Sequence, residues 1–222
     1  MEKRCMSQFD QAAPSLMVDQ WIQGDPTNID QEQGNVILVE VFQVNCPGCF
    51  LYGLPAAIEI YQKFKGEALC VLGLATAFED FDKNNLENLK KLVFDGEVVG
   101  ETLNTMSSRE MLHGNRLQYS IPFPIAWDQV VDFRADVEET VRKMIQQDIP
   151  DFNNLPEESK PAISDQIRNY VKNKTRTART FESYALQGTP STILIDRKGN
   201  LRQKFFGAGH ELIDHVNILL KE

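Results

Sequence analysis

The chain of 222 residues is poor in positive charge, in cysteine and in long apolar runs. Its 23 lysines and arginines are outnumbered by 32 aspartates and glutamates, which leaves a formal net charge of −9. This balance argues against the basic surface that nucleic acid requires, so we expect no nucleic-acid partner. Four cysteines are too few to hold a chain of this length together as a disulfide framework. The composition, 42% hydrophobic and 25% charged, is that of a globular protein with a substantial core.

Membrane and export signals are also missing from the sequence. The longest apolar runs, Val36–Phe42 and Ala68–Ala77, fall far short of the ~20 residues that span a bilayer. Residues 1–10 have no apolar stretch behind their charges, as a secretory signal would. We therefore expect a cytoplasmic protein without a membrane partner, in which residues 1–12 form a flexible tail.

Strand and helix patterns alternate in the first half of the chain, which favours an α/β fold with parallel central strands. The expected strands are residues 36–42, 69–74, 191–196 and 201–206, and the expected helices are residues 50–65, 85–94 and 211–220. The last two strands are joined by the turn Arg197–Asn200, so we expect them to form a hairpin.

The segment between these two parts is less regular. We expect a short helix near residues 107–112 and, at residues 121–127, either an edge strand or an extended connection. Residues 130–185 show helical spacing throughout, in two apolar stripes interrupted by prolines. We interpret residues 130–180 as a helical insertion into the α/β domain.

The motif Cys46-Pro47-Gly48-Cys49 lies between a predicted strand and a predicted helix. Cys46 is then at a helix N-terminus, where free N–H groups and the helix dipole lower a thiol pKa from about 8.5 toward 7. Pro47 fits the first helical position, which needs no N–H group. The three-residue spacing lets Cys49 reach Cys46 and close a disulfide. We predict that Cys46 is the attacking nucleophile and Cys49 the resolving thiol.

Other interpretations of these cysteines remain open. Half of a zinc site would need a second pair of ligands, but Cys5 and Cys70 are isolated, and His210 and His215 lie on different faces of a predicted helix. We therefore expect no metal and no cofactor, and no catalytic role for Cys5 or Cys70. A pair of buried structural cysteines that is never oxidised is the remaining alternative.

The chain resembles the thioredoxin-like superfamily and, within it, the redoxin group of AhpC/TSA and TlpA-like proteins. The resemblance rests on the strand that leads into Cys46–Cys49 and on the segment Gly188–Gly199, which reads Gly-Thr-Pro, a strand, then Asp-Arg-Lys-Gly. It implies a three-layer α/β/α sandwich with a central mixed sheet. Residues 13–222 would form a single domain of this kind, interrupted by the helical insertion.

The same resemblance implies roles for residues around the cysteines. In this superfamily the proline of the second motif is cis and faces the disulfide, so Pro190 is the candidate, and Thr189 offers backbone bonds to an extended substrate. We expect Pro47 and Gly48 to contact the substrate as well. Glu40 lies where thioredoxins hold a buried carboxylate that relays a proton for the resolving cysteine; the alternative is a carboxylate at a wet sheet edge.

The sequence departs from two patterns within the redoxin group. TlpA-like reductases usually have Trp where this chain has Asn45, and often Glu where it has Tyr52. Peroxiredoxins have Pro and Thr or Ser where this chain has Val39 and Gln43, which disfavours peroxidase activity of the usual type.

We therefore expect a thiol–disulfide oxidoreductase that works through a mixed disulfide, in the reductive direction of a cytosol. Its partners would be protein or small-molecule disulfides and thiols, together with an electron-donor thiol system. The alternatives are a thiol-dependent peroxidase, and a binding module or redox sensor without catalytic activity.

Overall fold

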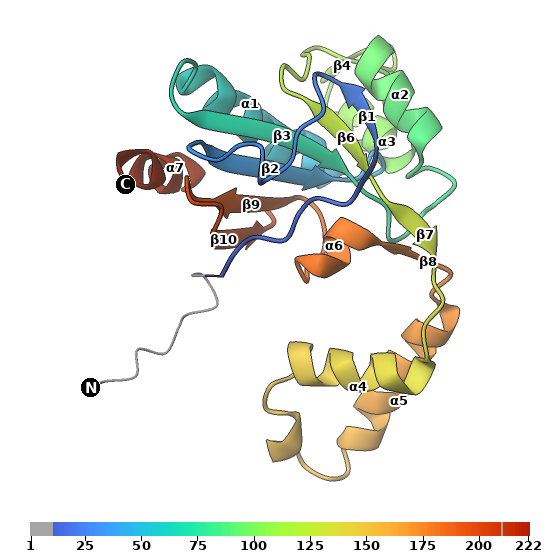
Figure 1. Cartoon of the computed structure of the whole chain (residues 1–222). Helices are drawn as coiled ribbons and strands as arrows, with labels where there is room; N and C mark the ends of the chain where they lie inside the picture. The colour runs from blue at the N-terminus through green and yellow to red at the C-terminus, as the bar shows by residue number, and fades with distance from the viewer. Residues whose placement is uncertain (1–10, 210) are drawn as a thin grey trace, which may run out of the picture. The chain divides into compact units, whose positions relative to one another are not determined.

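The computed structural model describes residues 11–209 and 211–222. Most of the expected tail, with Cys5, lies outside the described residues, and so does His210. The chain divides into two compact units: residues 131–177 form one, and the residues before and after them form the other. Each unit is described separately below (Figure 1).

A mixed sheet of six strands forms the centre of the larger unit, in the order β1-β6-β3-β2-β9-β10. The strands are β1 (Val18–Gln23), β2 (Val36–Phe42), β3 (Leu69–Ala75), β6 (Ile125–Asp128), β9 (Ser191–Ile195) and β10 (Leu201–Phe206). The three middle strands β2, β3 and β6 are parallel, whereas β1, β9 and β10 run antiparallel to their neighbours. The predicted α/β class with a mixed central sheet is confirmed.

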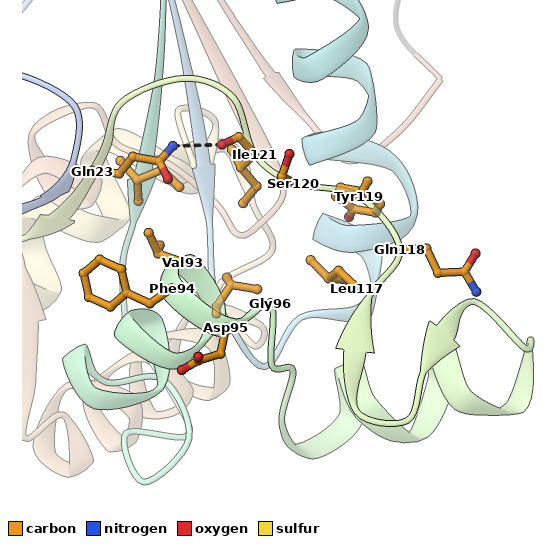
Figure 2. A pocket seen from close by; sticks show the side chains of 12 residues that line it. Gln23, Val93, Phe94, Asp95, Gly96, Leu117, Gln118, Tyr119, Ser120 and Ile121 are labelled. Carbon is orange, nitrogen blue, oxygen red and sulfur yellow. Dashed lines mark hydrogen bonds between the residues drawn. The ribbon is translucent and has the colours of Figure 1, made fainter.

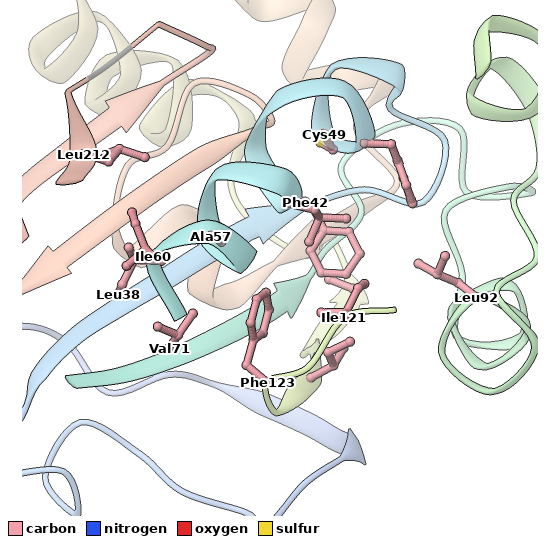
Figure 3. Close-up of a cluster of buried hydrophobic side chains, with 14 of the residues drawn as sticks. Leu38, Phe42, Cys49, Ala57, Ile60, Val71, Leu92, Ile121, Phe123 and Leu212 are labelled. Atoms are coloured by element: carbon pink, nitrogen blue, oxygen red, sulfur yellow. The ribbon is translucent and has the colours of Figure 1, made fainter. Parts of the chain in front are cut away.

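The sheet is buried on both faces because its central strands are apolar at consecutive positions and not only at alternate ones. In β2, Leu38 and Phe42 pack into one core, and Val39 and Val41 pack into the other. Figure 3 shows the first core, where side chains of α1 (Leu54–Lys63) meet the sheet. Glu40 has the same strand parity as Leu38 and Phe42, so its side chain is directed toward α1.

Helices of the larger unit cover the two faces unequally. They are η1 (a π-helix, Cys49–Gly53), α1 (Leu54–Lys63), α2 (Leu86–Asp95), α3 (Gly100–Ser108), α6 (Arg179–Ser183) and α7 (Leu212–Lys221). Residues of α1, α2, α3 and α7 join the first core, whereas the second core is closed by the short α6 and by Leu16 and Ile29 of the N-terminal segment. The second layer of the sandwich is therefore thin. A small hairpin, β4 (Leu112–His113) with β5 (Arg116–Leu117), follows α3.

Residues 131–177 form a helical hairpin. Its helices are α4 (Val137–Asp148), η2 (a 3₁₀ helix, Phe152–Asn154) and α5 (Lys160–Asn173). Val141 of α4 and Val171 of α5 are its two buried side chains among those described. Two short strands, β7 (Val130–Asp132) and β8 (Arg176–Ala178), pair where the chain enters and leaves this hairpin.

Three sequence predictions are wrong in position. The helix expected at residues 107–112 lies instead at Gly100–Ser108, because its start is fixed by a bond from a distant side chain, described below. The segment 121–127 is neither an edge strand nor only a connection: β6 begins at Ile125, after both prolines, and is enclosed between β1 and β3. The helical spacing of residues 130–136 is misleading, since β7 occupies Val130–Asp132, residues 133–136 are neither strand nor helix, and α4 begins at Val137.

Candidate redox site at Cys46 and Cys49

Three residues separate the redox motif from the carboxyl end of β2. Helical backbone begins at Pro47, and the first turns widen into the π-helix η1 before α1 continues from Leu54. Cys46 is thus the residue just before the helix, and its carbonyl accepts the first backbone bond, from the Cys49 N–H at 3.0 Å. The predicted place of the motif at a helix N-terminus is confirmed.

The two thiols have opposite environments. Cys46 is half-buried, and its sulfur accepts a hydrogen bond from the Cys49 N–H at 3.3 Å. A hydrogen bond from the Cys49 side chain, with backbone donors of the first turn, lowers the pKa of Cys46 to about 7. Cys49 is fully buried, and this desolvation raises its pKa well above that of an ordinary thiol. At neutral pH the accessible sulfur is therefore the one that ionises.

The segment that begins β9 lies against the motif. The Thr189–Pro190 peptide bond is cis, as expected, and the Thr189 carbonyl lies 3.5 Å from the Cys46 sulfur, from which it accepts a bond when the thiol is protonated. Pro190 packs on the motif itself. Its Cδ lies 3.5 Å from the place that a Cβ at position 48 would occupy, which is an ordinary van der Waals distance. Residues 143 positions apart in the sequence thus meet at one sulfur atom.

Glu40 is buried in the middle of the sheet. It is fully inaccessible, and desolvation raises its pKa to about 8. The Thr192 hydroxyl donates to Glu40 Oε2 at 2.8 Å and opposes part of this effect, whereas Oε1 has no hydrogen-bond partner. The charge of the Cys46 thiolate raises the pKa further, so the carboxyl responds to the state of that sulfur. The alternative of a wet sheet edge is excluded.

The absence of a side chain at Gly53 leaves room for the Glu40 carboxyl. A Cβ at this position would lie 2.1 Å from Glu40 Oε1 and 2.6 Å from Pro190 Cβ, both far closer than real contacts allow. Gly53 also follows Cys49 by four residues, which places the two on the same side of the helix. The glycine therefore links the helix of the resolving cysteine to the buried carboxyl.

Asn45, the residue before the nucleophile, fixes the loop to two other segments. Its amide donates to Asp80 Oδ2 at 2.9 Å, and its Oδ1 accepts the Glu101 N–H at 2.7 Å in the first turn of α3. Its own N–H donates to Asn84 Oδ1 at 2.8 Å. Asn45 thereby caps α3 from a distance and holds the chain that leads into Cys46.

Tyr119 bonds to the helix that follows Cys49. Its hydroxyl donates to the Phe50 carbonyl at 3.1 Å, and its burial raises its pKa. Tyr119 also lines a pocket of about 340 Å³ beside the C-terminal end of α2. Figure 2 shows Tyr119 in the wall of this pocket, with Gln23 bonded to the Ile121 carbonyl across it.

The remaining described cysteine lies away from this site. Cys70 is on β3, and burial raises its pKa to about 12, with a smaller contribution from Glu32. It lacks the helix N-terminus and the donors that favour the Cys46 thiolate. In the part of the chain that the structure describes, no cluster of three His, Cys, Asp or Glu side chains could hold a metal ion. Nor is any described helix long and apolar enough to cross a membrane.

Comparisons with known proteins bear on the fold. No family model and no curated protein matches the chain. Among solved structures, a thioredoxin-like superfamily protein is 25% identical, with a TM-score of 0.59 over 96% of this chain and 97% of that one. A thiol-disulfide isomerase from Corynebacterium glutamicum is 27% identical, with a TM-score of 0.56 over 95% and 97% of the two chains. The chain has a thioredoxin-like fold.

A third structure, a thioredoxin-like protein in its oxidised form, agrees in fold alone, at 16% identity and a TM-score of 0.54 over 96% and 97% of the chains. The thioredoxin-like fold is consistent with the resemblance to the redoxin group and accounts for the meeting of the two motifs. Thr192, Gly53 and Tyr119 were not among the candidate residues of the sequence. Thr192 could have been found, since alternation along residues 191–196 gives it the parity of a residue facing α1.

Proposed function

We propose that this protein is a thiol–disulfide oxidoreductase in which Cys46 attacks and Cys49 resolves. The observation that carries the proposal is the asymmetry of the two thiols. Cys46 is reachable and has a pKa of about 7, whereas Cys49 is buried with a raised pKa. A pair arranged in this way forms a mixed disulfide through one defined sulfur and closes it through the other.

The proposed cycle exchanges one disulfide for another in two displacements. The Cys46 thiolate attacks a sulfur of the substrate disulfide, forms a Cys46–substrate bond and releases the first substrate thiolate. Cys49 then loses its proton and attacks Cys46 Sγ, which breaks the mixed disulfide and releases the second substrate thiolate. The two electrons that reduce the substrate come from the Cys46–Cys49 pair, which ends as a disulfide. An external thiol system then reduces the pair again.

Glu40 is proposed to take the proton of Cys49 in the second displacement. Cys49 needs such a base because its buried thiol stays protonated at neutral pH. A pKa of about 8 leaves a carboxylate fraction near neutrality and lets the carboxyl give the proton up again. Its contact with Gly53, on the same side of the helix as Cys49, supports this role.

Substrates are proposed to be extended segments of protein, or small molecules, that contain a disulfide. The Thr189 backbone, Pro190, Pro47 and Gly48 would hold the substrate beside Cys46, since the Thr189 carbonyl borders the sulfur, Pro190 packs against Gly48, and Pro47 and Gly48 form the helix start. We propose a reductive direction in a cytosolic setting, where the thiol pool is kept reduced.

Trapping of mixed disulfides tests the proposal. The Cys49→Ser variant should retain disulfide partners covalently on Cys46, and a thiol reductant should release them. The Cys46→Ser variant, with Cys49 intact, is the matched control and should retain none. Insulin-disulfide reduction by the wild-type protein provides the activity readout. Trapping on Cys49 in the control, or equal reduction by Cys46→Ser, would contradict the assignment.

A further inference from the structure

The two oxygens of the Glu40 carboxyl differ in their surroundings. Thr192 donates to Oε2, whereas Oε1 is buried without a partner and lies where a Cβ of residue 53 would stand. A buried oxygen left without a partner needs a physical explanation, and exchange of a proton with a nearby water is one. Oε1 thus faces Gly53 without a hydrogen-bond partner among the described residues.

Gly53 and Thr192, the two neighbours of the carboxyl, also line a pocket on their solvent side. It has a volume of about 290 Å³. Ala56 and Leu212 belong to its walls on α1 and α7, and the loop 207–209 completes it. Gly53, which has no side chain, lies between this pocket and Oε1. The Thr192 hydroxyl beside it already donates a hydrogen bond to the carboxyl. Gly53 and Thr192 therefore each border both the pocket and the carboxyl.

We propose that Glu40 exchanges its proton with solvent through this pocket, between Gly53 and Thr192, and not past the Cys46 sulfur. The inference rests on the proposed relay by Glu40 and adds the route by which its proton enters and leaves. Gly53 is then a positioning residue, because it leaves room for the carboxyl and brings it within reach of the pocket.

During the catalytic cycle, the Glu40 proton needs a path to solvent that does not pass the Cys46 sulfur. The Cys46 thiolate is the titratable group whose charge raises the pKa of Glu40, so loss of that charge in the mixed disulfide favours release of the Glu40 proton. At this stage the substrate covers Cys46. A route on the far side of Gly53 lets the proton leave while the substrate is bound. The carboxylate then accepts the Cys49 proton, which follows the same path to solvent.

A single-turnover assay tests the route. A nitrothiobenzoate group is placed on Cys46 as a mixed disulfide, and attack by Cys49 releases it as a coloured thiolate. The Ala56→Leu variant fills the pocket and should release the group about tenfold more slowly than wild type, as expected when a proton transfer is impeded. Imidazole, a small proton carrier, should accelerate wild type at fixed pH and ionic strength but leave Ala56→Leu unchanged.

Two further variants make the result independent of folding defects. Ala208→Leu fills the pocket from an exposed position on the opposite wall and should act as Ala56→Leu does. Ser120→Leu adds the same side chain to the 340 Å³ pocket beside α2 and should behave as wild type. The rate of Cys46 alkylation should be equal in all of them. Wild-type release and a normal imidazole response in both pocket-filling variants would overturn the route.

The Glu40→Gln variant separates the two proposals. Slow release in Glu40→Gln together with normal release in the pocket-filling variants would preserve the relay and refute the route. Wild-type release in Glu40→Gln would refute the relay, and the route with it.

Discussion

Glu40 and Thr192 lie opposite each other on β2 and β9, and the Thr192 hydroxyl donates to Glu40 Oε2 at 2.8 Å. β9 begins directly after the cis Pro190, so the strand that gives the carboxyl its partner also fixes the residues beside Cys46. A slip of one residue in this pairing would turn Thr192 to the other face of the sheet. The register thus sets the chemistry of the carboxyl and the shape of the sulfur site together.

Replacement of Glu40 by Gln should stabilise the protein, and more strongly as the pH rises. The unfolded chain loses the Glu40 proton near 4.5, whereas the folded protein retains it up to a pKa of about 8. The folded state binds the additional proton in this window, so wild-type stability falls through it relative to the variant, by about 5 kcal/mol in total. Urea unfolding of the reduced proteins at pH 5, 7 and 8.5 measures the difference.

Glu59→Gln is the matched control for this prediction. Glu59 is an exposed carboxylate on α1, and its replacement should leave the pH dependence of wild type unchanged. A stability difference between Glu40→Gln and wild type that stays constant from pH 5 to 8.5 would contradict the burial argument.

Alkylation by iodoacetamide should modify Cys46 first, with a rate midpoint near pH 7. The Cys49→Ala variant should shift this midpoint upward, because it removes the hydrogen bond that contributes most to lowering the pKa of Cys46. Peptide mapping against pH identifies the modified residue, and Cys70→Ala serves as the control that should change nothing. Faster modification of Cys49 than of Cys46 would reverse the assigned roles.

A methyl group at position 53 should be far more damaging than one at position 48. Gly53→Ala places its Cβ 2.1 Å from Glu40 Oε1 and should cost about 1–3 kcal/mol of stability through overpacking. Gly48, five residues earlier, has a φ of −60°, and its added Cβ would meet only Pro190 Cδ at 3.5 Å, so Gly48→Ala should fold normally. Thermal unfolding compares the two variants, and equal stability would show that Glu40 does not depend on this space.

Loss of the Asn45 side chain should loosen α3 and the loop before Cys46 together. Asn45→Ala removes the acceptor of the Glu101 N–H and should cost about 1 kcal/mol, as loss of a helix cap does. Asn104→Ala, an exposed position on α3, is the control. Hydrogen exchange should rise in the first turn of α3 and in residues 43–46 of Asn45→Ala alone. Unchanged exchange in both segments would mean that Asn45 anchors neither.

Elements set by local pattern were predicted well from the sequence. β2 has the predicted bounds, Val36–Phe42, since six apolar residues, four of them Val or Ile, with one carboxylate among them favour a buried strand. The hairpin of β9 and β10 follows from its turn residues Arg197–Asn200. The redox motif was equally accessible, because a strand, Cys-x-x-Cys and a helix are adjacent in the sequence.

Elements set by distant contacts were not predictable in this way. α3 begins where Asn45 accepts the Glu101 N–H, and no window of sequence near α3 contains that information. β6 is interior because β1, more than 100 residues earlier, covers its outer edge. For the same reason the partners of Glu40 were missed: Thr192 and Gly53 meet the carboxyl through strand pairing and a close helix approach.

The pairing of β7 with β8 has a consequence for how this chain can vary. The chain leaves the central unit after Val130 and returns at Ala178, and the two strands at this crossing lie side by side, with Phe133 N–H bonded to the Thr175 carbonyl. A segment whose ends meet can be shortened, exchanged or replaced by a tight turn without re-threading any strand of the sheet. The sequence and length of residues 131–177 can therefore change without altering the strand order that positions Cys46.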